Sequence, residues 1–125
     1  MNRPRIIIVE DDTLLSRMYA TKFNAEGFDV LVALDGEIAL QFLHDKPKPD
    51  FMIMDMMMPK LSGFQVLEQM KNNPELAQIP VLILSNLQDL AQVHKTKELG
   101  VVGYLVKSNY TPSQIADFVK DYLAK

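Results

Sequence analysis

Residues 51–59 read Phe-Met-Ile-Met-Asp-Met-Met-Met-Pro, and this stretch decides the fold class. Its first four residues are apolar and lie between Pro49 and Pro59, which favours a short strand buried on both faces. Asp55 follows that strand directly. Ligands bind at the carboxyl ends of the strands in an open parallel sheet, so Asp55 is a candidate for chemistry at that edge.

Size, charge and composition limit the classes of protein to consider. The chain has 125 residues, a net charge of −3 and no cysteine. We expect residues 1–125 to form one domain without an effector domain, and the lack of cysteine excludes disulfides and thiolate metal sites. The acidic balance argues against binding of nucleic acid or an anionic membrane. No signal or membrane segment is recognisable at residues 1–10, so we expect a cytoplasmic protein.

Apolar runs alternate with helical patterns along the whole chain. Strands are expected at residues 5–9, 28–33, 51–54, 81–84 and 103–106, and helices at about 13–26, 37–44, 64–72, 87–99 and 112–122. Met18 and Leu90 are expected to face the core. The alternation predicts a doubly wound parallel sheet, an α/β fold of the (βα)5 type. The order 2-1-3-4-5 would put its switch point between the first and third strands.

Polar side chains follow four of the five strands, at Glu10 and Asp11, Asp55, Ser85 and Lys107. Three carboxylates in one crevice repel each other unless a divalent cation neutralises them, and an all-oxygen ligand set favours Mg²⁺ or Mn²⁺. Asp11 and Asp55 are expected as direct ligands, and Glu10 directly or through water. A carboxylate beside such an ion can attack phosphorus and form an aspartyl phosphate. Lys107 and the Ser85 hydroxyl would hold the remaining phosphoryl oxygens.

These motifs resemble the response-regulator receiver domains of two-component signalling, chemotaxis regulators among them. The matching stretches are residues 7–12, 53–55, 58–59, 63, 81–85 and 103–107. The resemblance implies a flavodoxin-like three-layer sandwich with sheet order 2-1-3-4-5. It implies that Asp55 is the phosphoacceptor, that the Met57 carbonyl completes the metal site of Glu10, Asp11 and Asp55, and that Lys107 pairs with the phosphate.

The same resemblance implies a switch and partners. Ser85 would be the switch hydroxyl, and Tyr104 the aromatic residue whose rotamer follows it. The phosphate would come from the phosphohistidine of a histidine kinase or histidine phosphotransfer protein. The fourth helix, fifth strand and fifth helix would form the face that changes on phosphorylation and contacts an effector or a second copy.

Three features depart from the family pattern or adjust the chemistry. Ser108 follows Lys107 where the family usually has a proline, often with a cis peptide bond between the two residues. A cis peptide bond before a residue other than proline costs about 2.5 to 4 kcal/mol, so a different loop path is expected after Lys107. Asn86 follows Ser85 where the family favours alanine or glycine. Met57 and Leu87 cannot orient an attacking water, so slow self-dephosphorylation is expected.

Three other functions fit parts of the pattern. A Mg²⁺-dependent phosphohydrolase with an Asp nucleophile usually needs a second acid two residues on, where this chain has Met57. A flavodoxin-like mononucleotide binder needs a phosphate cradle rich in glycine and hydroxyl groups, whereas residues 10–13 are mainly acidic. A pseudo-receiver that docks without phosphate is supported by the departures at Asn86 and Ser108. A receiver that catalyses only its own phosphoryl transfer and slow dephosphorylation accounts for more of the motifs.

Overall fold

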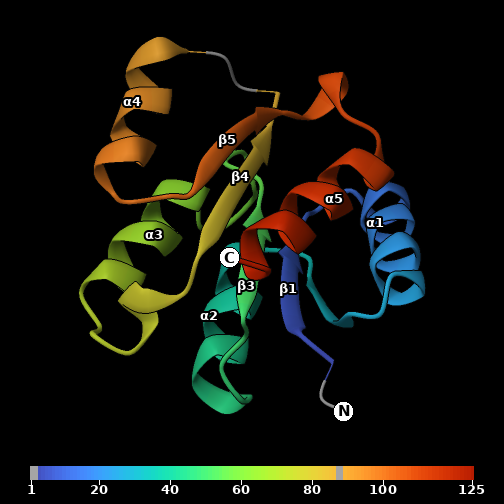
Figure 1. Cartoon of the computed structure of the whole chain (residues 1–125). Coiled ribbons are helices and arrows are strands. Elements are labelled where there is room, and N and C mark those ends of the chain that lie inside the picture. The colour runs from blue at the N-terminus through green and yellow to red at the C-terminus, as the bar shows by residue number, and fades with distance from the viewer. Residues whose placement is uncertain (1–2, 87–88) are drawn as a thin grey trace.

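A five-stranded parallel sheet forms the centre of the molecule (Figure 1). The computed structural model describes residues 3–86 and 89–125. The strands are β1 (Arg5–Val9), β2 (Asp29–Ala33), β3 (Phe51–Met54), β4 (Val81–Ser85) and β5 (Gly103–Val106). They are hydrogen-bonded in the order β2-β1-β3-β4-β5, and all four pairings are parallel. The expected doubly wound sheet and its order are therefore confirmed.

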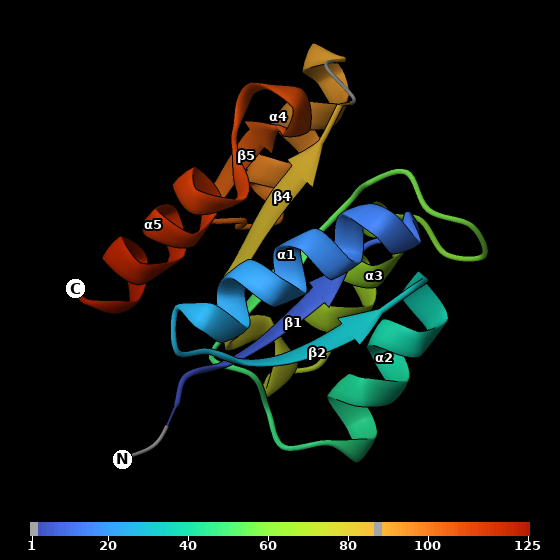
Figure 2. The same cartoon turned by 90° about the vertical axis from the view of Figure 1, so that its right-hand side faces the viewer.

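Helices cover both faces of the sheet. The α-helices are α1 (Thr13–Ala25), α2 (Gly36–Asp45), α3 (Gly63–Lys71), α4 (Leu90–Glu98) and α5 (Pro112–Leu123), and the 3-10 helices are η1 (Leu76–Gln78) and η2 (Lys107–Asn109). Helices α1 and α5 pack on one face, and α2, α3 and α4 lie on the other (Figures 1 and 2). This arrangement is the three-layer sandwich expected from the sequence.

The central strands are buried on both faces, which explains their continuous apolar sequences. Along β1, Ile7 and Val9 enter the apolar cluster beneath α2 and α3, whereas Ile6 and Ile8 enter the cluster beneath α1 and α5. Strand β3 alternates in the same way, with its two methionines on the first side. The two-residue period of a strand thus supplies both halves of the core from one short apolar run.

Two details of the helices differ from expectation. Helix α4 begins at Leu90 because the Asp89 side chain accepts hydrogen bonds from the Ala91 and Gln92 N–H groups and so caps the helix there. Leu90 is 84% exposed, and Thr96 is the buried residue of α4. Met18 of α1 is likewise exposed, since Ser16, Tyr19 and Phe23 form the buried stripe of that helix.

The helix lengths also bear on membrane insertion. Among the described residues, none of the helices combines the length and the apolar character that crossing a membrane requires.

Candidate functional site

Three carboxylates meet at the carboxyl edge of the sheet. Val9 and Met54 are paired residues at the ends of β1 and β3, so the residues that follow them, Glu10 and Asp55, come side by side. Each of Glu10, Asp11 and Asp55 has a carboxylate oxygen within 4.8 Å of the others. Glu10 and Asp55 are buried, whereas Asp11 is exposed. The predicted acidic cluster is therefore formed, with one side open to solvent.

Lys107 reaches this cluster from the start of η2, directly after β5. Its Nζ lies 2.6 Å from Glu10 Oε1 and 2.6 Å from Asp55 Oδ2. The Lys107 side chain is only 13% exposed. Because β4 separates β3 from β5 in the sheet, the long side chain must cross the end of β4 to make these contacts. One ammonium thus bridges the acids of two strands.

The two buried carboxylates are held in the same manner. Asp55 Oδ1 accepts a hydrogen bond from the Met57 N–H at 3.1 Å, and Glu10 Oε2 accepts one from the Asp12 N–H at 3.1 Å. Each carboxylate therefore has one oxygen on a backbone N–H and the other on Lys107. This pattern fixes the orientation of both acids before any ligand arrives.

Burial and charge shift the pKa values of two members of the site. Burial raises the pKa of Glu10 above its ordinary value, although the hydrogen bond from Lys107 opposes that shift. Burial acts to lower the pKa of Lys107, but its hydrogen bonds and attraction to Asp55 and Glu10 together raise it. Among the described residues, three carboxylates cluster here and the Lys107 ammonium pairs with two of them, so the site keeps an excess of negative charge that a divalent cation could neutralise.

Ser85 and Tyr104 lie next to this edge and are linked to each other. Ser85 is the last residue of β4 and is fully buried. Burial raises the pKa of Tyr104 on β5, while its side-chain hydrogen bond with Ser85 acts in the opposite direction. Tyr104 also packs against the apolar cluster beneath α2 and α3. A displacement of Ser85 would therefore alter the hydrogen bonding of the Tyr104 side chain on β5.

The residues that depart from the family pattern have defined places, apart from Leu87, which lies outside the described residues. Met57 is 62% exposed, two positions after Asp55. None of the described peptide bonds is cis. Asn86 Oδ1 accepts a hydrogen bond from the Ser108 N–H at 2.9 Å. Both residues stand out in the sequence as departures from the family pattern, but no local pattern predicts this bond, because the two lie 22 positions apart.

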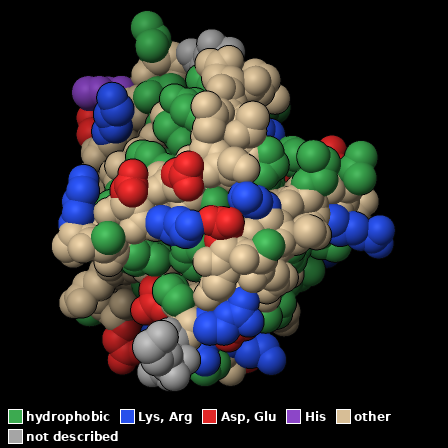
Figure 3. Space-filling model, turned by 45° about the vertical axis from the view of Figure 1, so that its right-hand side comes forward, with side chains coloured by type: hydrophobic (Ala, Val, Ile, Leu, Met, Phe, Trp, Pro, Cys, Tyr) green, Lys and Arg blue, Asp and Glu red, His purple; other side chains and the backbone are tan. Residues whose placement is uncertain are grey.

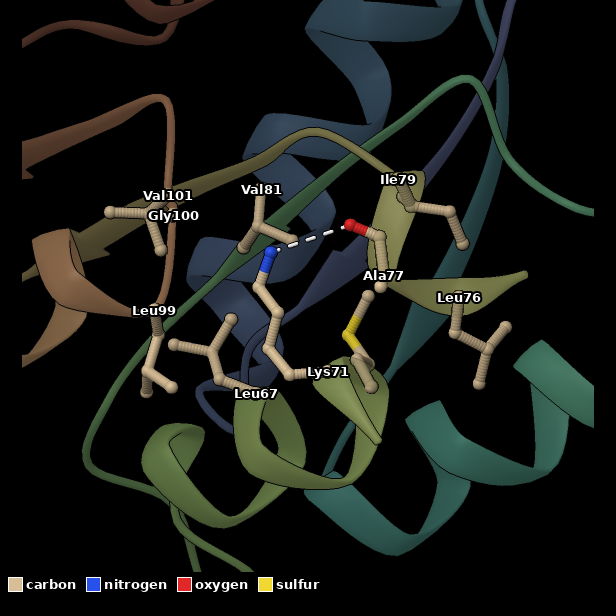
Figure 4. A pocket seen from close by; sticks show the side chains of 10 residues that line it. Leu67, Lys71, Leu76, Ala77, Ile79, Val81, Leu99, Gly100 and Val101 are labelled. Carbon is tan, nitrogen blue, oxygen red and sulfur yellow. Dashed lines mark hydrogen bonds between the residues drawn. The ribbon is translucent and has the colours of Figure 1, made fainter. Parts of the chain in front are cut away.

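A separate pocket lies away from the acids, between α3, η1 and the turn before β5 (Figure 4). Apolar residues such as Leu67 and Leu99 line it, and Lys71 Nζ donates to the Ala77 carbonyl across it at 3.3 Å. Its volume of about 10 Å³ is close to that of one water-sized sphere. This pocket is too small for a ligand.

The outer surface gives no sign of polyanion binding on the face drawn in Figure 3. Lys and Arg side chains are interspersed there with Asp and Glu side chains. Nucleic acids and anionic membranes are bound by faces on which basic side chains dominate. The face shown does not have that character.

The fold and the site define a doubly wound α/β protein with a lysine-bridged acidic pocket at the switch point of its sheet. The chain belongs to the response regulator receiver domain family, whose model matches residues 6–120. The resemblance noted in the sequence is therefore confirmed. Receiver domains of this family act in two-component systems.

Individual relatives agree with the family. The chain is 35% identical over 104 residues to the DNA-binding dual master transcriptional regulator RpaA of Synechocystis sp., covering 83% of this chain and 43% of the relative. The crystal structure of a putative response regulator from Chloroflexus aurantiacus has a TM-score of 0.87 and 27% identity, and the match covers 99% of this chain and 100% of that one. The phosphorylated cyanobacterial phytochrome response regulator RcpA has a TM-score of 0.83 and 27% identity, with 97% and 91% covered. The chain spans about half the length of the curated relatives that it matches first.

Proposed function

We propose that this chain is a phosphorylatable receiver in which Asp55 accepts a phosphoryl group from the phosphohistidine of a histidine kinase or histidine phosphotransfer protein. The observation that carries the proposal is the contact of Lys107 with both Asp55 and Glu10 at 2.6 Å. A buried carboxylate beside an ammonium and further acids can bind both the phosphoryl oxygens and the cation that accompanies them. A cytoplasmic location belongs to the same proposal.

The acids fit a hard divalent cation, Mg²⁺ or Mn²⁺. The donor set consists of oxygens only, and the three carboxylates are close enough to share one ion. In this proposal Glu10, Asp11, Asp55 and the Met57 backbone carbonyl hold it. The bound ion would supply positive charge and orientation for the phosphoryl oxygens.

The side chains of this chain do the remaining work. An Asp55 carboxylate oxygen bonds to phosphorus while the phosphorus–nitrogen bond of the donor breaks, and the bonding electrons stay on the donor imidazole. Lys107, already beside Asp55, binds a phosphoryl oxygen, and the Ser85 hydroxyl binds another. These two contacts stabilise the charge that spreads over the oxygens in a loose transition state. The chain thus catalyses only its own modification.

Phosphorylation would act as a switch. A phosphate adds roughly −1.5 to −2 charge at Asp55 and draws Ser85 and Lys107 towards it. Because Ser85 is hydrogen-bonded to Tyr104, the aromatic side chain changes its position with Ser85. Helix α4 buries only Thr96 within its bounds, so its packing is easily altered. We propose that the α4-β5-α5 face reports the change to an effector or to a second copy.

The lifetime of the aspartyl phosphate belongs to the same proposal. Met57 and Leu87 have apolar side chains that cannot orient a water for attack on the phosphoryl group. Asn86 directly follows Ser85. These three residues are proposed to set a slow rate of self-dephosphorylation. The rate is measured by removing the phosphodonor and following the loss of label. A lifetime of only seconds in the purified protein would contradict this part.

The direct test is incubation with acetyl phosphate and Mg²⁺, followed by mass spectrometry of the intact protein. Wild type should gain one phosphoryl group, and Asp55→Asn should gain none. Asp45→Asn, at an exposed position of α2, is the matched control and should be labelled like wild type. Label that persists on Asp55→Asn would refute Asp55 as the acceptor.

Two outcomes would favour other functions. Continuous turnover of a phosphomonoester would indicate a phosphohydrolase, although the residue two positions after Asp55 is the exposed Met57. Binding to a kinase without any labelling would indicate a phosphorylation-independent docking module.

A further inference from the structure

The bond between Asn86 and Ser108 joins the two residues that follow the side chains proposed to bind the phosphoryl group. Asn86 directly follows Ser85, and Ser108 directly follows Lys107. The β4–β5 pairing ends at Ser85 and Val106. The Asn86 side chain then accepts from the Ser108 N–H at 2.9 Å, beyond the last paired residues. This side chain therefore continues the connection between the strands after their ladder has stopped.

The start of η2 explains why such an acceptor is needed. The first N–H groups of a helix have no partner within the helix, and a side chain at the N-cap usually satisfies one of them. Here the N-cap is Val106, which makes no side-chain cap hydrogen bond. Asn86 supplies the acceptor from another loop instead. Ser108 can donate only because it is not a proline, since proline has no N–H.

We propose that Asn86 is a positioning residue: it caps η2 through the Ser108 N–H and so holds Lys107 at the acidic pocket. Lys107 is the first residue of η2, one position before the bonded N–H. Movement of η2 would move the Lys107 ammonium, which lies 2.6 Å from both Asp55 and Glu10. This inference rests on the proposed function, because it concerns how Lys107 is presented for phosphoryl transfer.

The bond itself is tested without any phosphodonor. Amide hydrogen exchange of Ser108, followed by NMR, should be slow in wild type and should accelerate in Asn86→Ala, roughly two- to tenfold for the loss of one hydrogen bond. Ser108→Ala retains the N–H and should keep the protection at position 108. Equal exchange in wild type and Asn86→Ala would overturn the proposal.

The positioning role is tested on the rate of labelling by acetyl phosphate. Asn86→Ala should slow labelling of Asp55, again roughly two- to tenfold. Asn109→Ala removes an exposed amide from the same short helix and should label at the wild-type rate. Mg²⁺ affinity should not weaken in Asn86→Ala, because the acids follow β1 and β3, which this bond does not touch. A wild-type rate in Asn86→Ala, or a loss of Mg²⁺ affinity that accounts for the slower rate, would overturn the role.

A donor-side variant separates this bond from other effects of Asn86. Ser108→Pro removes the N–H, so Asn86→Ala should change the labelling rate less in the Ser108→Pro background than in wild type. An equal effect in both backgrounds would mean that Asn86 acts by another route. If wild type is not labelled at all, the proposed function fails and this inference with it. If wild type is labelled and Asn86→Ala is unchanged, only this inference fails.

Discussion

The Lys107 ammonium lies 2.6 Å from Asp55 Oδ2, although 52 residues separate the two in the sequence. The same ammonium lies 2.6 Å from Glu10 Oε1. Both acids are buried, so salt in the solvent screens these contacts less than it screens surface pairs. In the described part of the chain, Lys107 is therefore the cation that pairs with both buried acids of the site.

Removing that cation should destabilise the protein. In Lys107→Ala, Glu10 and Asp55 each lose a partner, and we expect the free energy of unfolding at neutral pH to fall by about 1–3 kcal/mol without divalent cations. Mg²⁺ should bind more tightly, because the ammonium no longer competes for the same oxygens. Urea unfolding with and without Mg²⁺ measures both effects. Lys97→Ala, at an exposed position of α4, is the control and should stay within about 0.5 kcal/mol of wild type.

The raised pKa of Glu10 predicts a pH dependence of stability. In the unfolded chain Glu10 titrates near its ordinary pKa of 4.5, and in the folded protein it titrates higher because burial disfavours its charge. The folded state thus binds the proton more tightly, so wild type loses stability as the pH rises from about 4.5 through the folded pKa. Glu10→Gln cannot ionise and should lack this loss. Urea unfolding across this pH range, without divalent cations, should show that the free energy of unfolding of Glu10→Gln rises relative to that of wild type as the pH rises. If the two free energies change in parallel with pH, the raised pKa of Glu10 is contradicted.

Lys60 adopts a left-handed backbone conformation, with φ of 69°. This conformation costs a residue with a Cβ roughly 1–2 kcal/mol, a cost that glycine does not bear. Its Nζ also lies 3.6 Å from Asp35 Oδ2. Lys60→Gly and Lys60→Ala both lose that ion pair, so their difference isolates the backbone. The glycine variant should be the more stable by about 1 kcal/mol in urea unfolding, and equal stabilities would show that the turn relaxes.

Gly63 allows the start of α3 to approach Asp55. A Cβ at this position would lie 2.8 Å from the Asp55 carbonyl oxygen and 2.9 Å from Met56 Cα. Because both are backbone atoms, Gly63→Ala should cost about 1–3 kcal/mol and also slow phosphorylation by moving Asp55.

Gly27 is the matched control for that variant. It has φ of +96°, and a Cβ there would meet nothing within 4 Å. Gly27→Ala should therefore lose stability through backbone strain alone and keep the wild-type labelling rate. Equal loss of labelling in the two alanine variants would mean that the effect at Gly63 is not local.

Local sequence was sufficient for the fold because each element carries its own pattern. The apolar runs of the central strands, Asp55 directly after one of them, and a last helix beginning at residue 112 were all predicted and found. The prediction failed for α4, where Leu90 is exposed and the helix starts later. That helix has a weak apolar stripe, so a cap residue rather than periodicity sets its start.

The sequence by itself determined which polar side chains stand at or just after the strand ends, since each apolar run gives way there to Glu10, Asp55, Ser85 or Lys107. Only the tertiary structure decided how these side chains meet: that Lys107 crosses β4 to join two acids, and that Asn86 caps a turn 22 residues away. The physical reason is the separation along the sequence over which each kind of interaction acts. Strand and helix patterns arise between near neighbours, whereas ion pairs and hydrogen bonds between loops depend on the sheet order and on where each side chain comes to rest.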